Sequence, residues 1–125
     1  MSADAGPAAA IWIDIDHVKD FGDPEGHAAG DEQIRLIAAV IRAVAGDGST
    51  YRADGDEFLV ALPGATIDDA AQLARRIREA VEAETQLTIS VGVASGADVY
   101  DAWARAEPRP GIAKMAGRNA VSVER

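Results

Sequence analysis

The chain has 125 residues, an ordinary apolar content and a formal net charge of −9, which suits one domain with its own core. The acidic balance argues against duplex nucleic acid as a partner, and no apolar run approaches the roughly 20 residues that cross a membrane. The absence of cysteine excludes disulfides and thiolate metal ligands, and the lack of a signal-peptide pattern in residues 1–10 predicts a cytoplasmic location.

The first half of the chain predicts a tail, a strand and a helix. Residues 1–9 are expected to form a disordered tail, and residues 10–125 a single domain. A short apolar strand is expected at 10–16, where AIWIDID becomes acidic at its end. Glycine and proline predict a loop over 17–26. Between 27 and 45, apolar residues recur at spacings of three and four, which indicates an amphipathic helix.

A β-hairpin is expected next. Two short strands are predicted at 49–53 and 57–62, with a tip that begins at Asp54-Gly55. This dipeptide is a strong hairpin signal because it tolerates the positive φ of tight turns. A hairpin tip does not need the additional acids Asp56 and Glu57.

The second half of the chain predicts one long helix, one strand and a small helical insert. In chain order these are a helix that follows the N-cap Thr66, a β-branched strand at 87–95, a helix near 98–106, a helical turn at 111–117 and a closing strand at 120–125. The order βαββαβ, with this insert before the last strand, predicts an α+β fold. We expect a ferredoxin-like or palm-type, antiparallel-rich sheet with both long helices on one face.

The acids at the end of the first strand and in the hairpin are expected to converge. In this topology the first strand lies beside the strand that leaves the hairpin, so Asp14 and Asp16 would approach Asp56 and Glu57. Taken separately, each acidic group is more simply explained as solvated side chains. Together they favour a site for Mg²⁺ or Mn²⁺, because these ions prefer carboxylate and phosphate oxygens.

Four ordered segments of the sequence resemble one known family. They are DIDHVKDFGDPEGHAAGD (14–31), RADGDEF (52–58), TISVGVA (88–94) and AKMAGRN (113–119). These segments resemble the DxDxFKxxNDxxGHxxGD, RxGGDEF, TxSxGVA and AKxxGRN patterns of the GGDEF domain of diguanylate cyclases. The agreement covers most of the chain and keeps the same order.

The resemblance implies a metal site in the acidic cluster. Asp14, the carbonyl of Ile15 and Asp56 would bind two Mg²⁺ or Mn²⁺ ions. Glu57 would also serve the metals or help to activate the attacking 3′-hydroxyl group. Asp16 is a secondary candidate for this site.

The resemblance also implies a nucleotide site. The backbone of the 16–19 loop, which ends at Lys19, would hold the triphosphate together with Lys114 and Arg118. Asp31 would accept hydrogen bonds from the guanine edge, and Gly55 would let the nucleotide approach the hairpin. The implied reaction joins two nucleoside triphosphates, with GTP favoured, into a cyclic dinucleotide such as c-di-GMP, and it releases pyrophosphate. Each nucleotide would be bound by one protomer of a head-to-tail homodimer.

Some positions depart from the family pattern. Gly22 stands where the family has a guanine-reading Asn, and Asp54 replaces the first glycine of the signature, where it adds charge beside an anionic substrate. The RxxD motif of product inhibition is absent, because Ala45 and Gly48 occupy its two positions. The chain also begins almost directly at the first strand, without the family's leading helix, so control by a linked receptor is not expected.

Two prolines are a further departure. Pro108 and Pro110 are expected to break or restart the helix that precedes Lys114. A restarted helix would re-aim the Lys114 side chain, which the resemblance assigns to the triphosphate.

These departures leave two alternatives open. The compact frame and the loss of the guanine-reading Asn also resemble the minimal CRISPR polymerases, which would imply a cyclic oligonucleotide made from ATP in phage defence. The other alternative is a degenerate GGDEF domain that binds a nucleotide or a partner protein without turnover.

Overall fold

The computed structural model describes residues 6–20 and 27–125. The part of the expected tail at 1–5 and most of the predicted loop, including Gly22, lie outside the described residues. The first strand begins at Ala8, earlier than expected, so Ala8 and Ala9 belong to the sheet and are buried. The alternating-face pattern could not reveal this, because alanine is small enough to pack on either face of a sheet.

The elements follow the expected order, and their bounds differ from expectation by one or two residues. They are β1 (Ala8–Ile15), a 3-10 turn (Val18–Asp20), α1 (His27–Ala45), a 3-10 turn (Asp47–Ser49), β2 (Thr50–Asp54), β3 (Glu57–Pro63), α2 (Ile67–Glu84), β4 (Ile89–Gly96), α3 (Val99–Ala106), α4 (Arg109–Met115) and β5 (Ala120–Val123). Within the described residues, no helix is long and apolar enough to cross a membrane.

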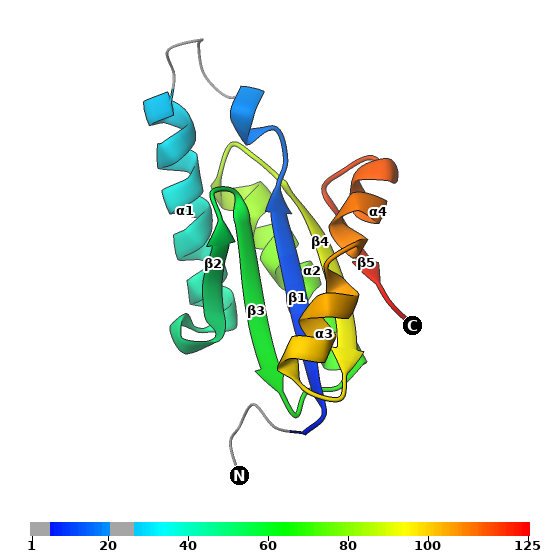
Figure 1. Ribbon diagram of the computed structural model, residues 1–125. Helices are drawn as coiled ribbons and strands as arrows, with labels where there is room; N and C mark the ends of the chain where they lie inside the picture. Colours follow the sequence, from blue (N-terminus) through cyan, green and yellow to red (C-terminus); the bar gives the residue numbers. More distant parts are fainter. Residues whose placement is uncertain (1–5, 21–26) are drawn as a thin grey trace.

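One five-stranded sheet organises the molecule, with the strand order β2-β3-β1-β4-β5. The central strand β1 runs antiparallel to both β3 and β4, whereas β5 adds to the edge of β4 in parallel. The long helices α1 and α2 cover one face, and α3 and α4 lie on the other (Figure 1). The predicted α+β palm-type architecture is therefore confirmed.

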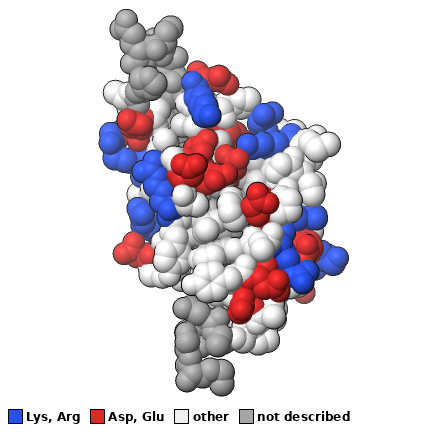
Figure 2. Space-filling view, in the orientation of Figure 1, with Lys and Arg blue, Asp and Glu red and all other residues white. Residues whose placement is uncertain are grey.

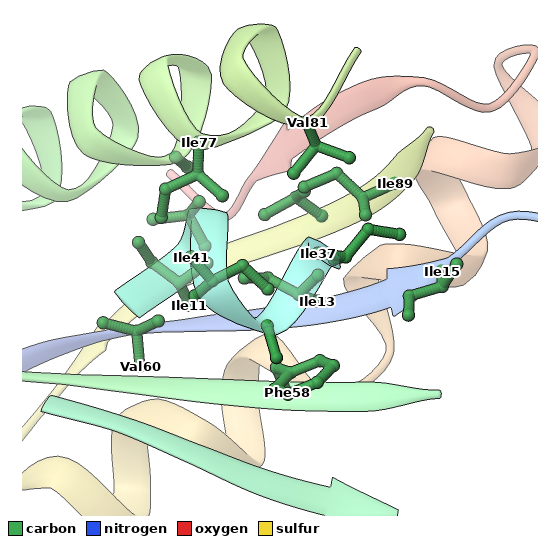
Figure 3. Packing of buried hydrophobic residues seen from close by; sticks show 14 of the residues in the cluster. Ile11, Ile13, Ile15, Ile37, Ile41, Phe58, Val60, Ile77, Val81 and Ile89 are labelled. Carbon is green, nitrogen blue, oxygen red and sulfur yellow. The ribbon is translucent and has the colours of Figure 1, made fainter. Parts of the chain in front are cut away.

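The main core lies between the sheet and the two long helices (Figure 3). Ile11, Ile13 and Ile15 of β1 point into it and pack with Ile37 of α1 and Ile77 of α2. Each such side chain contributes about 1.5–3 kcal/mol when fully buried. Since successive side chains of a strand alternate between faces, Asp14 projects from the opposite face.

Local capping signals account for the starts of α2, α3 and α4. The hydroxyl of Thr66 accepts a hydrogen bond from the backbone N–H of Asp69, which confirms it as the N-cap of α2. Asp98 caps α3 in the same way. Pro108 and Pro110 restart the helix as expected, because a proline is tolerated in the first turn, where the N–H has no helical partner.

Gly92 of β4 lets the junction between α3 and α4 pack directly on the sheet. A Cβ atom at Gly92 would lie 2.6 Å from the Ala106 carbonyl oxygen and 2.7 Å from Cδ of Pro110. The sheet and the backbone at this junction thus approach closely enough to exclude any side chain at position 92.

We therefore expect Gly92→Ala to destabilise the fold by about 1–3 kcal/mol, as is typical of overpacking. Gly111→Ala is the matched control, because a Cβ at this α4 position meets nothing within 4 Å. Alanine should be neutral or stabilising there, by up to about 1 kcal/mol. Thermal unfolding followed by circular dichroism measures both, and equal melting temperatures for the two variants would contradict the close approach.

Candidate functional site

The end of β1 and the hairpin tip meet at one place on the α3/α4 face of the sheet. Asp14 pairs with Glu57 directly across the β1–β3 ladder. The N–H of Ile15 donates to the Asp56 carbonyl over 3.0 Å, which fixes the hairpin tip to the end of β1. Strand register therefore brings Asp14 next to the neighbouring acids Asp56 and Glu57, which lie far from it in the sequence.

The hairpin loop itself consists of Gly55 and Asp56, because Asp54 is the last residue of β2. The Asp54 carboxylate turns back onto the loop and accepts the Gly55 N–H over 2.8 Å. Arg52 closes the loop from outside by donating to the Gly55 carbonyl over 2.6 Å. Gly55 is not among the residues with positive φ, so that expectation from the Asp-Gly dipeptide is wrong. A register irregularity between Arg52 and Asp54 accommodates the turn instead.

The effect of the clustered negative charge is seen in the pKa of Glu57. Partial burial raises the pKa of the Glu57 carboxyl above its usual range, and the negative charges of Asp14, Asp56 and Asp54 raise it further. A hydrogen bond from the Trp12 side chain acts in the opposite direction and lowers this pKa. The ionised cluster is thus short of positive charge, which a cation could supply.

Lys114 provides some of that charge. Its Nζ atom lies 2.6 Å from Oδ2 of Asp14, and both side chains are partly buried. The pair joins α4 to the end of β1, across 100 positions of sequence. The restarted helix therefore aims Lys114 into the acidic cluster.

The donor set fits a divalent cation that is shared with a substrate. Within residues 6–20 and 27–125, no three His, Asp or Glu side chains are arranged to hold a metal ion by themselves. Mg²⁺ commonly uses one or two carboxylates and completes its shell with water and substrate phosphates. Asp14, Asp56 and Glu57 offer oxygen ligands of this kind, as does the Ile15 carbonyl.

Asp16 does not join the acidic cluster, contrary to expectation. Its side chain is 1% exposed and turns toward β4, where it accepts hydrogen bonds from Thr88, Ser90 and the backbone of Asn119. The expectation rested on the shared face of Asp14 and Asp16. It could not foresee that hydroxyl groups on β4 would bind the second acid.

Three other residues predicted to bind the nucleotide lie on exposed parts of the segments that follow β1, begin α1 and follow α4. Arg118 is exposed, in a tight turn after α4, and Lys19 is exposed in the 3-10 turn after β1. Asp31 is exposed near the start of α1, next to Gly30, which packs against Val18 of that turn. Figure 2 shows acidic side chains gathered near the middle of this face, with basic side chains on either side.

Several residues that shape the site had no predicted role beyond membership of a family motif or packing. Thr88 and Ser90 bind Asp16, Asn119 joins the same network, and the Trp12 side chain lowers the pKa of Glu57. A signal for the first two was present, because they are polar residues at a spacing of two in an otherwise apolar strand. No comparable signal marked Trp12, which is explained equally well by packing.

The raised pKa of Glu57 generates a prediction about stability. A carboxyl whose pKa is higher in the folded than in the unfolded chain destabilises the fold when ionised, and the loss is relieved as pH falls through the raised pKa. Glu57→Gln should therefore raise the melting temperature at pH 7, with a gain of about 0.2–1 kcal/mol in the free energy of unfolding, the usual size of a cross-strand pair. The gain should shrink as the pH falls toward 4.5, the usual value of the group.

Melting curves of wild type and variant between pH 4 and pH 8 measure this difference. Glu79→Gln is the control, since Glu79 is an exposed acid on α2 that makes only a 3.9 Å contact with Arg78. A Glu57→Gln protein that is less stable than wild type at pH 7 would show that the acids do not repel one another.

Sequence comparisons identify relatives of the whole domain. The family model "Diguanylate cyclase, GGDEF domain" matches residues 2–120. A protein described as probable diguanylate cyclase DgcF of Escherichia coli K12 is 36% identical over 99 residues, which cover 72% of this chain and 31% of that protein. Response regulator PleD of Caulobacter vibrioides is 35% identical over 133 residues, which cover 92% of this chain and 29% of PleD. The chain thus spans about a third or less of the length of these curated relatives.

Solved structures agree with this similarity. The GGDEF domain of DgcB from Caulobacter crescentus, in complex with c-di-GMP, matches with a TM-score of 0.84 and 28% identity, covering 94% of this chain and 78% of that one. The active GGEEF domain of a diguanylate cyclase from Vibrio cholerae matches with a TM-score of 0.80 and 30% identity, covering 96% and 84%. The sequence resembles both GGDEF domains and minimal CRISPR polymerases, and these matches are to GGDEF domains. The chain belongs to the GGDEF domain family of diguanylate cyclases.

Proposed function

We propose that this domain condenses two molecules of GTP into c-di-GMP and releases pyrophosphate. The observation that carries the proposal is the meeting of Asp14 with Asp56 and Glu57 beside Lys114, in a chain of the diguanylate cyclase family. The c-di-GMP bound by the GGDEF domain of DgcB, a protein of the same fold, supports the choice of product.

In the proposed mechanism, the chain positions the triphosphate and neutralises its charge. Lys114 and Arg118 would bind phosphate oxygens, together with the backbone of the 16–19 loop that ends at Lys19. Asp31 would orient the guanine by accepting its hydrogen bonds. Holding both reactants in line accounts for much of the rate in reactions of this class.

Glu57 is suited to receive a proton. Each 3′-oxygen attacks the α-phosphorus of the other nucleotide, so a P–O bond forms, pyrophosphate leaves and the 3′-hydroxyl proton must be accepted. The raised pKa makes the Glu57 carboxylate a stronger base than an ordinary glutamate. We assign Glu57 to this proton transfer or to metal binding, and Asp56 to metal binding.

Two divalent cations, Mg²⁺ or Mn²⁺, would be held by Asp14, the Ile15 carbonyl, Asp56 and Glu57. When bound, they would supply charge neutralisation at the reacting hydroxyl and at the leaving pyrophosphate. The acidic cluster is short of positive charge without them, which supports this assignment.

A second copy of the chain is part of the proposal. We assign one nucleotide to each copy, and the product joins two nucleotides through two equivalent bonds. A head-to-tail homodimer would present the two nucleotides to each other with the required symmetry. Specific activity should therefore fall when the enzyme is diluted.

The test of the proposed function is a product assay with each nucleoside triphosphate and either Mg²⁺ or Mn²⁺. We expect c-di-GMP and pyrophosphate from GTP, and no product from Asp56→Ala, whose melting temperature should be no lower than that of wild type. No cyclic product or pyrophosphate from any triphosphate, alone or mixed, would overturn the proposal. A preference for ATP would favour the reaction of the minimal CRISPR polymerases.

One observation favours a second candidate, a domain that binds GTP without turnover. Asp54 adds its negative charge to Glu57, at a position where the family has glycine. GTP binding in calorimetry without any product would support this candidate. In that case Asp54→Gly is the change expected to restore turnover, because it removes both the bulk and the charge.

The contact between Lys114 and Asp14 leads to a prediction about metal affinity. The ammonium group occupies Oδ2 of Asp14, so it competes with a cation for this oxygen. Lys114→Gln should therefore bind Mn²⁺ alone several-fold more tightly, while its KM for GTP rises because a phosphate ligand is lost.

Calorimetric titration with Mn²⁺ measures the first effect and steady-state kinetics the second. Arg35→Gln is the matched control, since it changes the charge equally but lies on the exposed side of α1, paired with Glu32. Unchanged or weaker Mn²⁺ binding by Lys114→Gln would show that Lys114 does not compete for Asp14.

A further inference from the structure

Asp16 is a buried acid that the proposed mechanism does not use. Its Oδ1 accepts a hydrogen bond from Oγ of Ser90 over 2.6 Å, and its Oδ2 accepts from Oγ1 of Thr88 over 2.7 Å and from the N–H of Asn119 over 3.1 Å. Both carboxylate oxygens are therefore engaged by groups of the chain itself. A metal ion at Asp16 would have to displace these donors, which are buried or partly buried.

The three donors come from two different segments. Thr88 directly precedes β4 and Ser90 follows Ile89, the first residue of that strand, whereas Asn119 lies between α4 and β5. Asp16 itself directly follows β1, the strand that carries Asp14. The carboxylate thus joins the metal-binding strand to the turn that carries Arg118.

This turn has an unusual backbone. Arg118 and Asn119 have φ angles of 64° and 46°, in the left-handed region that residues with a side chain rarely adopt, although Asn enters it more easily than Arg. Such a conformation persists only where surrounding contacts hold it. The Arg118 N–H donates to the Ala113 carbonyl over 3.1 Å, and the Asn119 N–H donates to Asp16.

The Asn119 side chain anchors the turn on its other side. Its Oδ1 accepts from Nη1 of Arg78 over 2.9 Å, and its Nδ2 donates to Glu82, both on α2. Asn119 is thereby held between Asp16 and α2, while the neighbouring Arg118 side chain is exposed on the surface. The direction of Arg118 depends on a backbone that Asp16 helps to fix.

We propose that Asp16 is a positioning residue that holds the 117–119 turn, so that Arg118 meets the triphosphate. This inference rests on the proposed function, because it takes Arg118 to be a phosphate ligand. It assigns no metal to Asp16, in contrast to Asp14 two residues earlier. Removing the anchor should weaken phosphate binding and leave the metal site intact.

A double-mutant cycle with Arg118 is the test. The probe is the α,β-methylene analogue of GTP with Mg²⁺, whose dissociation constant is measured by calorimetry. Asp16→Ala and Arg118→Ala should each weaken binding by about tenfold, the usual size of a lost charge-assisted contact. In the Arg118→Ala background, Asp16→Ala should add less than about twofold, because the residue it positions is already gone.

A conservative variant and a second readout separate positioning from general damage. Asn at position 16 can still accept the Asn119 N–H through its carbonyl oxygen and donate to the Ser90 hydroxyl, so Asp16→Asn should restore most of the affinity. Mn²⁺ alone should bind Asp16→Asn as it binds wild type, whereas Asp14→Asn should lose affinity. If Asp16→Ala does not fold, Thr88→Val replaces it in the cycle, because it removes one of the three donors and keeps the shape.

The outcomes are distinct. Additive losses in the cycle, or an unchanged nucleotide affinity in Asp16→Ala, would overturn the positioning role while leaving the proposed function in place. Loss of Mn²⁺ binding in Asp16→Asn would make Asp16 a metal ligand and would also overturn it. A wild-type protein that binds no analogue would overturn the proposed function and this inference together.

Discussion

The antiparallel pairing of β1 with β3 on one side and β4 on the other is the interaction on which the site depends. Because side chains alternate between faces, this register sends Ile11, Ile13 and Ile15 into the core and Asp14 to the opposite face. A slip of one residue would bury the carboxylate and expose the isoleucines. Core packing therefore fixes Asp14 opposite Glu57 without any contact made for catalysis.

The site formed in this way is electrostatically unfavourable by itself. Burial and three neighbouring acids raise the pKa of Glu57. Lys114 neutralises only part of the negative charge of the cluster, because it pairs with Asp14 alone among these acids. Interactions that are costly in the free protein become useful when a cation and a phosphate-bearing ligand complete them. Stability is thus lowered locally where binding is needed, a compromise common in functional sites.

The turn that carries Arg118 is held by a hydrogen bond to a buried carboxylate and not by strand register. Two left-handed residues, Arg118 and Asn119, stand next to each other, and the carboxylate of Asp16 supplies the hydrogen bond that holds the second. A buried carboxylate with several donors can specify one local conformation, since leaving those donors unpaired would be costly. The two acids of one short segment therefore have opposite surroundings: Asp14 faces the acidic cluster and Asp16 faces donors.

Much of this molecule could be read from local signals, and the remainder depended on contacts between distant segments. Periodicity, capping and spacing act over a few residues, so they were enough to predict the bounds of α1, the Thr66 cap of α2, the element order and the family motifs. Three other features became visible only in the folded chain: Lys114 contacts Asp14, Asp16 turns to Thr88 and Ser90, and Asp54 ends a strand. These outcomes rest on the packing of α4 and β4 against β1, and no short stretch of sequence encodes which hydroxyl or ammonium group will reach a given carboxylate.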